Sequence, residues 1–142
     1  MSLVRDIVHH RELFFVEEHQ NVTEVAGRMA DLHVGAIVVL KEGSLRGVFS
    51  ERDLMKRVVL ERRDPDRTPV SHVMSMEVIT IDELASLEEA MEAMQNHNCR
   101  HLPVTHGGRV VSFLSMRDLM NYELARKTEE LHHMRAYISN GS

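Results

Sequence analysis

The chain of 142 residues contains little cysteine, few aromatic side chains and no tryptophan. Its single cysteine, Cys99, cannot form an internal disulfide, which favours a reducing, cytoplasmic environment over a secreted one. Two tyrosines and four phenylalanines are the only aromatic residues, so a surface that stacks the bases of single-stranded nucleic acid is not expected.

The sequence also lacks an excess of positive charge and a long apolar run. Lysine and arginine total 17 against 22 acidic residues, and a net charge of −5 repels the phosphate backbone of nucleic acids. The longest clearly apolar run, residues 36–40, is far shorter than the roughly 20 residues that span a bilayer. The first residues do not resemble a signal peptide. We therefore expect a soluble, cytoplasmic protein without nucleic-acid or membrane partners.

An internal repeat is the most informative feature that is present. Shifted by 65 residues, the sequence aligns with itself without a gap from about residue 14 to residue 55. The sequence Ser-Glu-Arg-Asp-Leu-Met at residues 50–55 then aligns with Ser-Met-Arg-Asp-Leu-Met at residues 115–120. Only two copies exist and their period is long, which indicates a paired fold rather than a solenoid.

Each copy has the pattern of a β-α-β-β-α unit. Short apolar runs at residues 14–16 and 78–81 predict the first strand of each copy. Apolar residues at helical spacing follow, and in the second copy Ser86 is a plausible N-cap for this helix. Two strands joined by a glycine turn precede a last helix, which opens at Ser50 in one copy and at Ser115 in the other.

These elements predict an α/β (α+β) protein with two repeats packed through their sheets. Each repeat of roughly 50–60 residues would be marginal alone, so packing of one against the other is expected. The predicted boundaries are residues 1–63 for the first repeat, 64–69 for a linker with two prolines, 70–125 for the second repeat and 126–142 for a helical tail.

The two copies resemble the cystathionine-β-synthase (CBS) domain, a β-α-β-β-α unit that ends in hydrophobic-Ser/Thr-x-x-Asp and occurs in tandem pairs called Bateman modules. Residues 47–53 carry the resemblance in the first copy and residues 101–118 in the second, and the match covers roughly residues 4–125. The sequence departs from the family at Ser112, where the family usually has glycine, and at Val38, where it has proline.

The resemblance implies a regulatory module that binds AMP, ADP, ATP or S-adenosylmethionine in two clefts and signals to an unknown protein partner. The motif aspartates Asp53 and Asp118 would accept hydrogen bonds from the ribose hydroxyls, and Ser50 and Ser115 would face the ribose or the phosphate. No catalytic motif such as Gly-x-Ser-x-Gly or His-Glu-x-x-His is present, so enzymatic activity is not expected.

The second copy carries more positive charge at its predicted site. Arg100 and His101 stand where, as the resemblance implies, related pairs often place phosphate-contacting side chains, and the first copy has Gly35 and Ala36 there. A nucleotide is therefore expected to prefer the cleft built mainly from the second copy. The other cleft is expected to be apolar, suited to a base or empty. The full set of candidate ligand-binding residues is Asp118, Ser115, Arg117, Arg100, His101, Pro103, Thr80, Asp53, Ser50, Arg52, Gly35 and Ala36.

Several of these residues also have ordinary structural explanations. Ser-x-x-Asp is a common helix-capping sequence, and both explanations can hold together. Arg52 and Arg117 occupy the second position of a helix, where they either reach a phosphate or lie in solvent. Thr80 either contacts the adenosine or only favours a strand.

Two further alternatives concern metal binding and protein interaction. His97, Cys99 and His101 alternate and would share one face of a strand, but the paired spacing of a structural zinc site is missing, so no metal is expected. The chain could also be a scaffold that binds proteins and no nucleotide.

The tail carries a short heptad pattern. Leu124, Leu131 and Ile138 lie seven residues apart, with Met120 and Met134 between them. This pattern predicts a helix that either pairs with a second copy, giving a homodimer, or folds back over its own domain. The homodimer is the expectation we carry forward.

Overall fold

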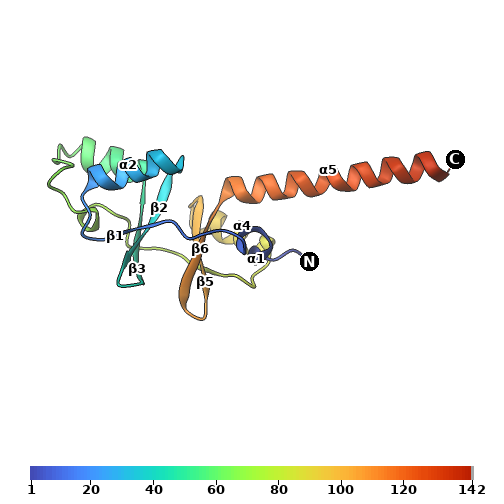
Figure 1. The fold of residues 1–142 in the computed structure, drawn as a ribbon, viewed down its shortest axis with the longest axis horizontal. Coiled ribbons are helices and arrows are strands. Elements are labelled where there is room, and N and C mark those ends of the chain that lie inside the picture. Colours follow the sequence, from blue (N-terminus) through green and yellow to red (C-terminus); the bar gives the residue numbers. More distant parts are fainter. Residues whose placement is uncertain (142) are drawn as a thin grey trace.

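The computed structural model describes residues 1–141 and contains two three-stranded sheets, separate helices for each sheet, and one long helix that projects from the molecule (Figure 1). The first sheet consists of β1 (Phe15–Glu17), β2 (Ala36–Lys41) and β3 (Ser44–Ser50), and the second of β4 (Ile81–Asp82), β5 (His101–His106) and β6 (Arg109–Ser115). In both sheets the first strand is parallel to the second, and the second is antiparallel to the third. The predicted α/β pair of repeats is confirmed.

The helices that follow the first strands begin at side-chain caps. Asn21 and Ser86 accept hydrogen bonds from the backbone N–H groups of Glu24 and Glu89, which fixes the starts of α2 (Val22–Leu32) and α4 (Leu87–Asn96). The predicted cap at Ser86 is confirmed. The other helical elements are α1 (Val4–Val8), α3 (Glu51–Asp53), the π-helical stretch η1 (Leu54–Val59), the 3-10 turn η2 (Val70–His72) and α5 (Met116–Gly141).

The first strand of the second copy is shorter than predicted. Residues 78–80 do not pair with another strand and β4 begins at Ile81, so the prediction that Thr80 lies inside this strand is wrong. Continuing the β4–β5 register by one residue would set Thr80 opposite Pro103, which has no N–H to donate to a neighbouring strand. In the first copy the corresponding residue is Val38, and it pairs with Phe15.

Each sheet has its own apolar core. The segment that precedes each repeat in the sequence packs in the core of the other repeat, and we call this arrangement the exchange. The first core includes Phe49 and Ile37 of the first sheet together with Val70, Val73 and Met74, which follow the linker. The second core takes Val4 and Val8 from α1, at the opposite end of the sequence. The exchange ties the halves together, because neither core is complete without a segment adjacent to the other repeat.

The halves also meet through their strands. Strand β3 contacts β6, and Val48 of β3 exchanges backbone hydrogen bonds of 3.0 and 2.9 Å with Ser75. At Gly47 this approach is so close that an added Cβ would lie 2.6 Å from the carbonyl oxygen of Ser75. The equivalent residue of the second copy is Ser112, which is buried and faces a cavity instead.

Helix α5 extends away from both sheets for most of its length (Figure 1). Its five apolar heptad residues are between 52% and 66% exposed: Met120, Leu124, Leu131, Met134 and Ile138. Of the two alternatives for the tail, folding back over its own domain is therefore wrong for the residues described. Within residues 1–141, no helix combines the length and the apolar character required to cross a bilayer.

Candidate functional site

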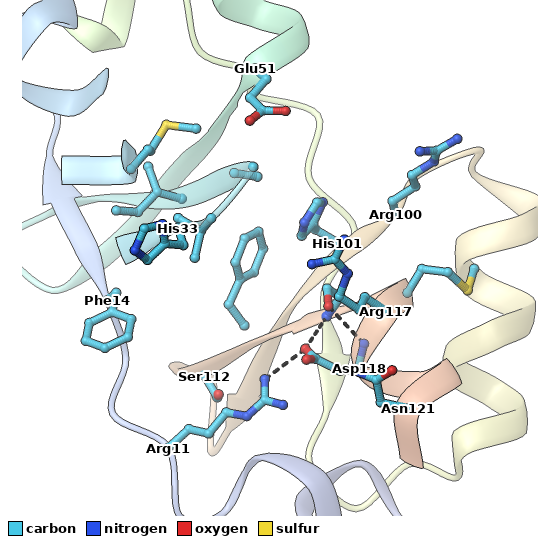
Figure 2. Close-up of a pocket in the computed structure, with 18 of the residues that line it drawn as sticks. Arg11, Phe14, His33, Glu51, Arg100, His101, Ser112, Arg117, Asp118 and Asn121 are labelled. Atoms are coloured by element: carbon cyan, nitrogen blue, oxygen red, sulfur yellow. Dashed lines mark hydrogen bonds and ion pairs between the residues drawn. The ribbon is translucent and has the colours of Figure 1, made fainter. Parts of the chain in front are cut away.

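A cavity of about 1460 Å³ opens between the two halves, where α2 and β2 face β5, β6 and the first turns of α5 (Figure 2). The loop before β1 closes one side of it. The polar and charged residues that line this cavity are Arg11, Glu12, His33, Glu51, Arg100, His101, Ser112, Ser115, Arg117, Asp118 and Asn121.

Asp118 lies in the opening turn of α5 and takes part in capping this helix. Its Oδ2 accepts a hydrogen bond of 2.8 Å from the backbone N–H of Ser115, and its own N–H donates to Oγ of Ser115 over 3.0 Å. Oδ2 also accepts a hydrogen bond of 2.8 Å from Nη1 of Arg11 (Figure 2). Asp118 lines the cavity, and among residues 1–141 every hydrogen bond to its carboxylate ends on Oδ2, which leaves Oδ1 as an acceptor for a ligand.

The surroundings of Asp118 keep it ionised. Burial alone would raise the pKa of this carboxyl, but hydrogen bonding with Arg11 and Ser115, together with the charge of Arg11, lowers the pKa below its ordinary value of 3.8. A charged acceptor therefore faces the cavity at neutral pH.

His101 supplies a largely neutral imidazole to the same wall. Burial lowers its pKa from the ordinary value of 6.5, and the nearby charge of Asp118 offsets this effect only in part. The ring stacks on Phe113, with centroids 5.2 Å apart and planes inclined by 20°.

Two arginines bring positive charge to this side of the cavity. Arg100 precedes β5 and Arg117 lies in the first turn of α5, and Figure 2 shows both on the same side as His101. Over the described part of the chain neither forms an ion pair, so both guanidinium groups are available to an anion.

The opposite wall is mainly apolar, with His33 and Glu51 as its polar residues. It is formed by Met29 and Val34 at α2 and just beyond it, by Ala36 and Ile37 of β2, and by Phe14 from the loop before β1. Phe14 is partly exposed although large, so its ring presents an apolar face to whatever occupies the cavity. An apolar wall opposite a charged one suits a ligand with a flat ring system at one end and anionic groups at the other.

The structure brings seven of the predicted site residues together. The lining of this one cavity includes Gly35, Ala36, Arg100, His101, Ser115, Arg117 and Asp118. The other five, Ser50, Arg52, Asp53, Thr80 and Pro103, lie outside it.

The assignment of Gly35 and Ala36 to a separate cleft is wrong. These residues line the same cavity as their counterparts Arg100 and His101, because equivalent segments of the two copies face each other across it. The equivalence is visible in the backbone: Glu51 donates its N–H to the carbonyl of Gly35 over 3.0 Å, and Met116 donates its N–H to that of Arg100 over 2.8 Å.

Asp53 has the same capping geometry as Asp118 but different surroundings. Its Oδ2 accepts hydrogen bonds from the N–H and the hydroxyl of Ser50, and its Oδ1 accepts one of 3.0 Å from the hydroxyl of Ser75. Arg57 lies 3.8 Å from Oδ1, and the residue is only 7% exposed. Both oxygens of Asp53 are thus occupied by protein groups.

Sequence reasoning missed several residues of the cavity, above all Arg11, Phe14, His33 and Ser112. Arg11 lies outside the stretch that repeats, so no counterpart drew attention to it. Ser112 did give a signal, since it stands where the family usually has glycine. Within residues 1–141 no three His, Cys, Asp or Glu side chains are grouped so that they could hold a metal ion.

The fold defines a tandem pair of small α/β repeats with one cavity between them. The family model described as the CBS domain matches the chain twice, over residues 4–60 and 70–125. The chain belongs to the CBS-domain family, and the resemblance noted in the sequence is confirmed.

Known relatives of this chain are also CBS-domain proteins. It is 33% identical to the CBS domain-containing protein YhcV of Bacillus subtilis, with 90% of each chain covered. The crystal structure of the CBS-domain containing protein ATU1752 from Agrobacterium tumefaciens shares 28% identity and a TM-score of 0.79, covering 86% of this chain and 99% of that one. CBS domain protein PAE2072 from Pyrobaculum aerophilum, solved in complex with AMP, shares 30% identity and a TM-score of 0.75, covering 82% and 88%.

Proposed function

We propose that this chain is a non-catalytic regulatory module of the cytoplasm that binds an adenosine-containing ligand in the cavity between its repeats. The observation that carries the proposal is the cavity itself, in which Asp118 and two available arginines face an apolar wall. The AMP complex of PAE2072 supports an adenosine ligand for a relative that is 30% identical.

The proposed contacts follow from the chemistry of each wall. Oδ1 of the ionised Asp118 accepts hydrogen bonds from the ribose hydroxyls. The adenine ring packs on the apolar wall beside Phe14, and the phosphates lie near Arg100 and Arg117. Positive charge around the phosphate end favours AMP, ADP or ATP over S-adenosylmethionine, whose sulfonium group is itself a cation.

In this proposal, helix α5 transmits a conformational change from the ligand site to a protein partner. Its first turn carries Ser115, Arg117 and Asp118, and the same helix continues to Gly141, far from the cavity (Figure 1). A ligand that binds one position of this turn more tightly than another shifts the whole helix toward that position. We assign the exposed stripe on α5 to a homodimer, since a second copy brings an equal stripe, and a regulated protein partner would then sense the dimer.

Calorimetric titration of AMP, ADP, ATP and S-adenosylmethionine into the wild-type chain tests the proposal. Asp118→Ala is expected to abolish binding, and Asp53→Ala is the matched control, because it removes the equivalent motif residue outside the cavity. Loss of binding in the Asp53 variant alone would move the site to the other motif. If no ligand binds the folded wild type, the nucleotide-independent scaffold, favoured by the exposed stripe of α5, replaces this proposal.

A further inference from the structure

Arg11 forms the one ion pair that joins the loop before β1 to the capping motif of the second repeat, among the residues described. Its Nη1 lies 2.8 Å from Oδ2 of Asp118, although the two residues are 107 positions apart in the sequence. The arginine side chain is 38% exposed and the carboxylate 20% exposed, so the pair lies at the edge of the cavity rather than in its floor. Figure 2 shows the guanidinium directed from the loop toward Asp118.

The first repeat has no such arrangement. There Oδ1 of Asp53 accepts a hydrogen bond from the neutral hydroxyl of Ser75, and the arginine near it, Arg57, comes from the helical segment that Asp53 itself begins. Arg57 also donates a hydrogen bond of 2.7 Å to the carbonyl of Met74. Arg11 differs because it comes from a loop and because, among the residues described, its side chain forms a hydrogen bond and an ion pair with Asp118 alone.

The hydrogen-bonding capacity of Arg11 is mostly unused. A guanidinium has five N–H donors in a planar fork, and one of them is engaged with Asp118. A phosphate accepts two parallel N–H bonds from such a fork and carries more charge than one carboxylate. A phosphate that binds near Arg100 and Arg117 therefore also competes with Asp118 for Arg11, or shares Arg11 with it.

We infer that Arg11 makes this cavity selective for phosphorylated adenosine ligands over uncharged nucleosides. Arg11 pairs with Oδ2 of Asp118. A phosphorylated ligand provides a new partner for the guanidinium and frees Oδ2 for the ribose in addition to Oδ1. A nucleoside provides no anion, so its ribose has only Oδ1 of Asp118 as an acceptor. The inference rests on the proposed function and adds the feature of the ligand that Arg11 recognises.

The test compares titrations of adenosine, AMP and ATP into wild type, Arg11→Ala, Arg11→Lys and Arg109→Ala. Arg109 is the matched control, because it is an exposed arginine at the hairpin end of β6, opposite the end that reaches the cavity. Arg11→Ala is expected to weaken AMP and ATP binding about tenfold, the loss of roughly one charge-assisted hydrogen bond. Adenosine binding is expected to stay the same or to tighten, and Arg11→Lys to retain part of the preference for phosphate.

The ratio of AMP affinity to adenosine affinity separates the possible roles of Arg11. If Arg11→Ala weakens adenosine and AMP by the same factor, Arg11 only positions Asp118, and the inference is wrong. An unchanged affinity for all three ligands overturns it as well. If the wild type binds none of the three, the proposed function fails and the inference falls with it.

Discussion

At the scale of single residues, the Ser-x-x-Asp motif combines two roles that sequence reasoning had kept as alternatives. Asp118 caps α5 through Ser115, and the same residue lines the cavity with its Oδ1 not engaged by any described residue. Asp53 makes the same cap, but Ser75 and Arg57 occupy its second oxygen. The motif therefore predicts the cap in both copies, whereas availability to a ligand depends on residues distant in the sequence.

Removing Arg11 should raise the pKa of Asp118. Arg11→Ala deletes a hydrogen bond and a positive charge that lower this pKa, while the burial that raises it remains. Carbon-13 NMR of the Asp118 carboxyl measures the shift directly. Because the folded pKa lies below that of the unfolded chain, ionised Asp118 stabilises the wild type above about pH 4 and loses this effect as the pH falls through the folded value. In Arg11→Ala that pH-dependent part of the stability should shrink; an unchanged carboxyl pKa would contradict the ion pair.

His101 should titrate below pH 6.5, because burial disfavours its charged form. The unfolded chain takes up this proton at a higher pH than the folded one, so acidification from about pH 6.5 costs stability. Asp118 raises the pKa of His101, and Asp118→Asn should therefore lower it further. Nitrogen-15 NMR of the imidazole gives both values. A His101 that titrates at or above the ordinary value would contradict the buried, neutral ring.

The site residues that could be predicted from sequence are those inside the repeat. Arg100, His101, Arg117 and Asp118 follow from the resemblance to the CBS domain together with the comparison of the two copies, and all four line the cavity. Arg11 could not be found in this way, because it lies before the repeated stretch and reaches the cavity only through the fold.

At the scale of elements, the periodicity of the strands and the caps of the helices could be predicted, whereas the start of β4 could not. The second core shows that Ile81 is buried, and the sequence before it has the composition of a strand. Pairing nevertheless begins only at Ile81, opposite Val104, just past Pro103. Local composition therefore predicted a strand where the partner strand lacks a donor.

Strand β3 should be intolerant of any side chain at Gly47. A Cβ there would lie 2.6 Å from the backbone oxygen of Ser75 and 2.9 Å from Sδ of Met74. We expect Gly47→Ala to lower the free energy of unfolding by about 1–3 kcal/mol, as overpacking does elsewhere. The control is Gly27→Ala in α2, where nothing lies within 4 Å of the added Cβ and stability should rise by up to about 1 kcal/mol. Urea denaturation of both variants provides the comparison, and a neutral Gly47→Ala would show that β3 and Ser75 separate easily.

The apolar stripe of α5 should set the association state of the chain. Leu131→Glu introduces a charge in the middle of the stripe and is expected to shift a dimer toward monomer, because burying that carboxylate is costly. Lys127 interrupts the stripe, so Lys127→Leu should strengthen association. Ala136→Glu adds the same charge away from the stripe and should leave association unchanged. Sedimentation equilibrium measures all three, and a wild type that is monomeric at high concentration rules out the homodimer.

At the scale of the whole molecule, the boundaries of the sequence repeats do not coincide with the boundaries of the two apolar cores. The repeat boundaries assign residues 4–8 to the first repeat, yet Val4 and Val8 lie in the second core. Val70 and Val73 follow the linker and lie in the first core. Sequence comparison could not reveal the exchange, because the two leading segments resemble each other and each is apolar enough for either core. The exchange also explains why Arg11 lies at the cavity. The loop from α1 to β1 must pass from one half to the other, and it does so alongside the cavity.

This exchange predicts which fragment of the chain retains structure. All residues of the first core lie between Val16 and Met74, and the N–H of Val70 donates to the carbonyl of Gln20 over 2.8 Å. A fragment of residues 13–76 therefore contains the complete core. A fragment of residues 1–63, of almost the same length, follows the repeat boundary but lacks Val70, Val73 and Met74.

We expect residues 13–76 to show more helix by circular dichroism than residues 1–63, and a more cooperative urea transition. Both fragments expose the sheet face that normally meets the second half, and both are near the size at which a core is marginal. The stability that each fragment loses in these two ways is similar, so it does not affect the comparison. The difference that remains is the burial of three apolar side chains, each of which contributes about 1.5–3 kcal/mol when fully buried. If residues 1–63 prove as structured as residues 13–76, the exchanged segments add little to the first core, and the halves are held together mainly through β3 and β6.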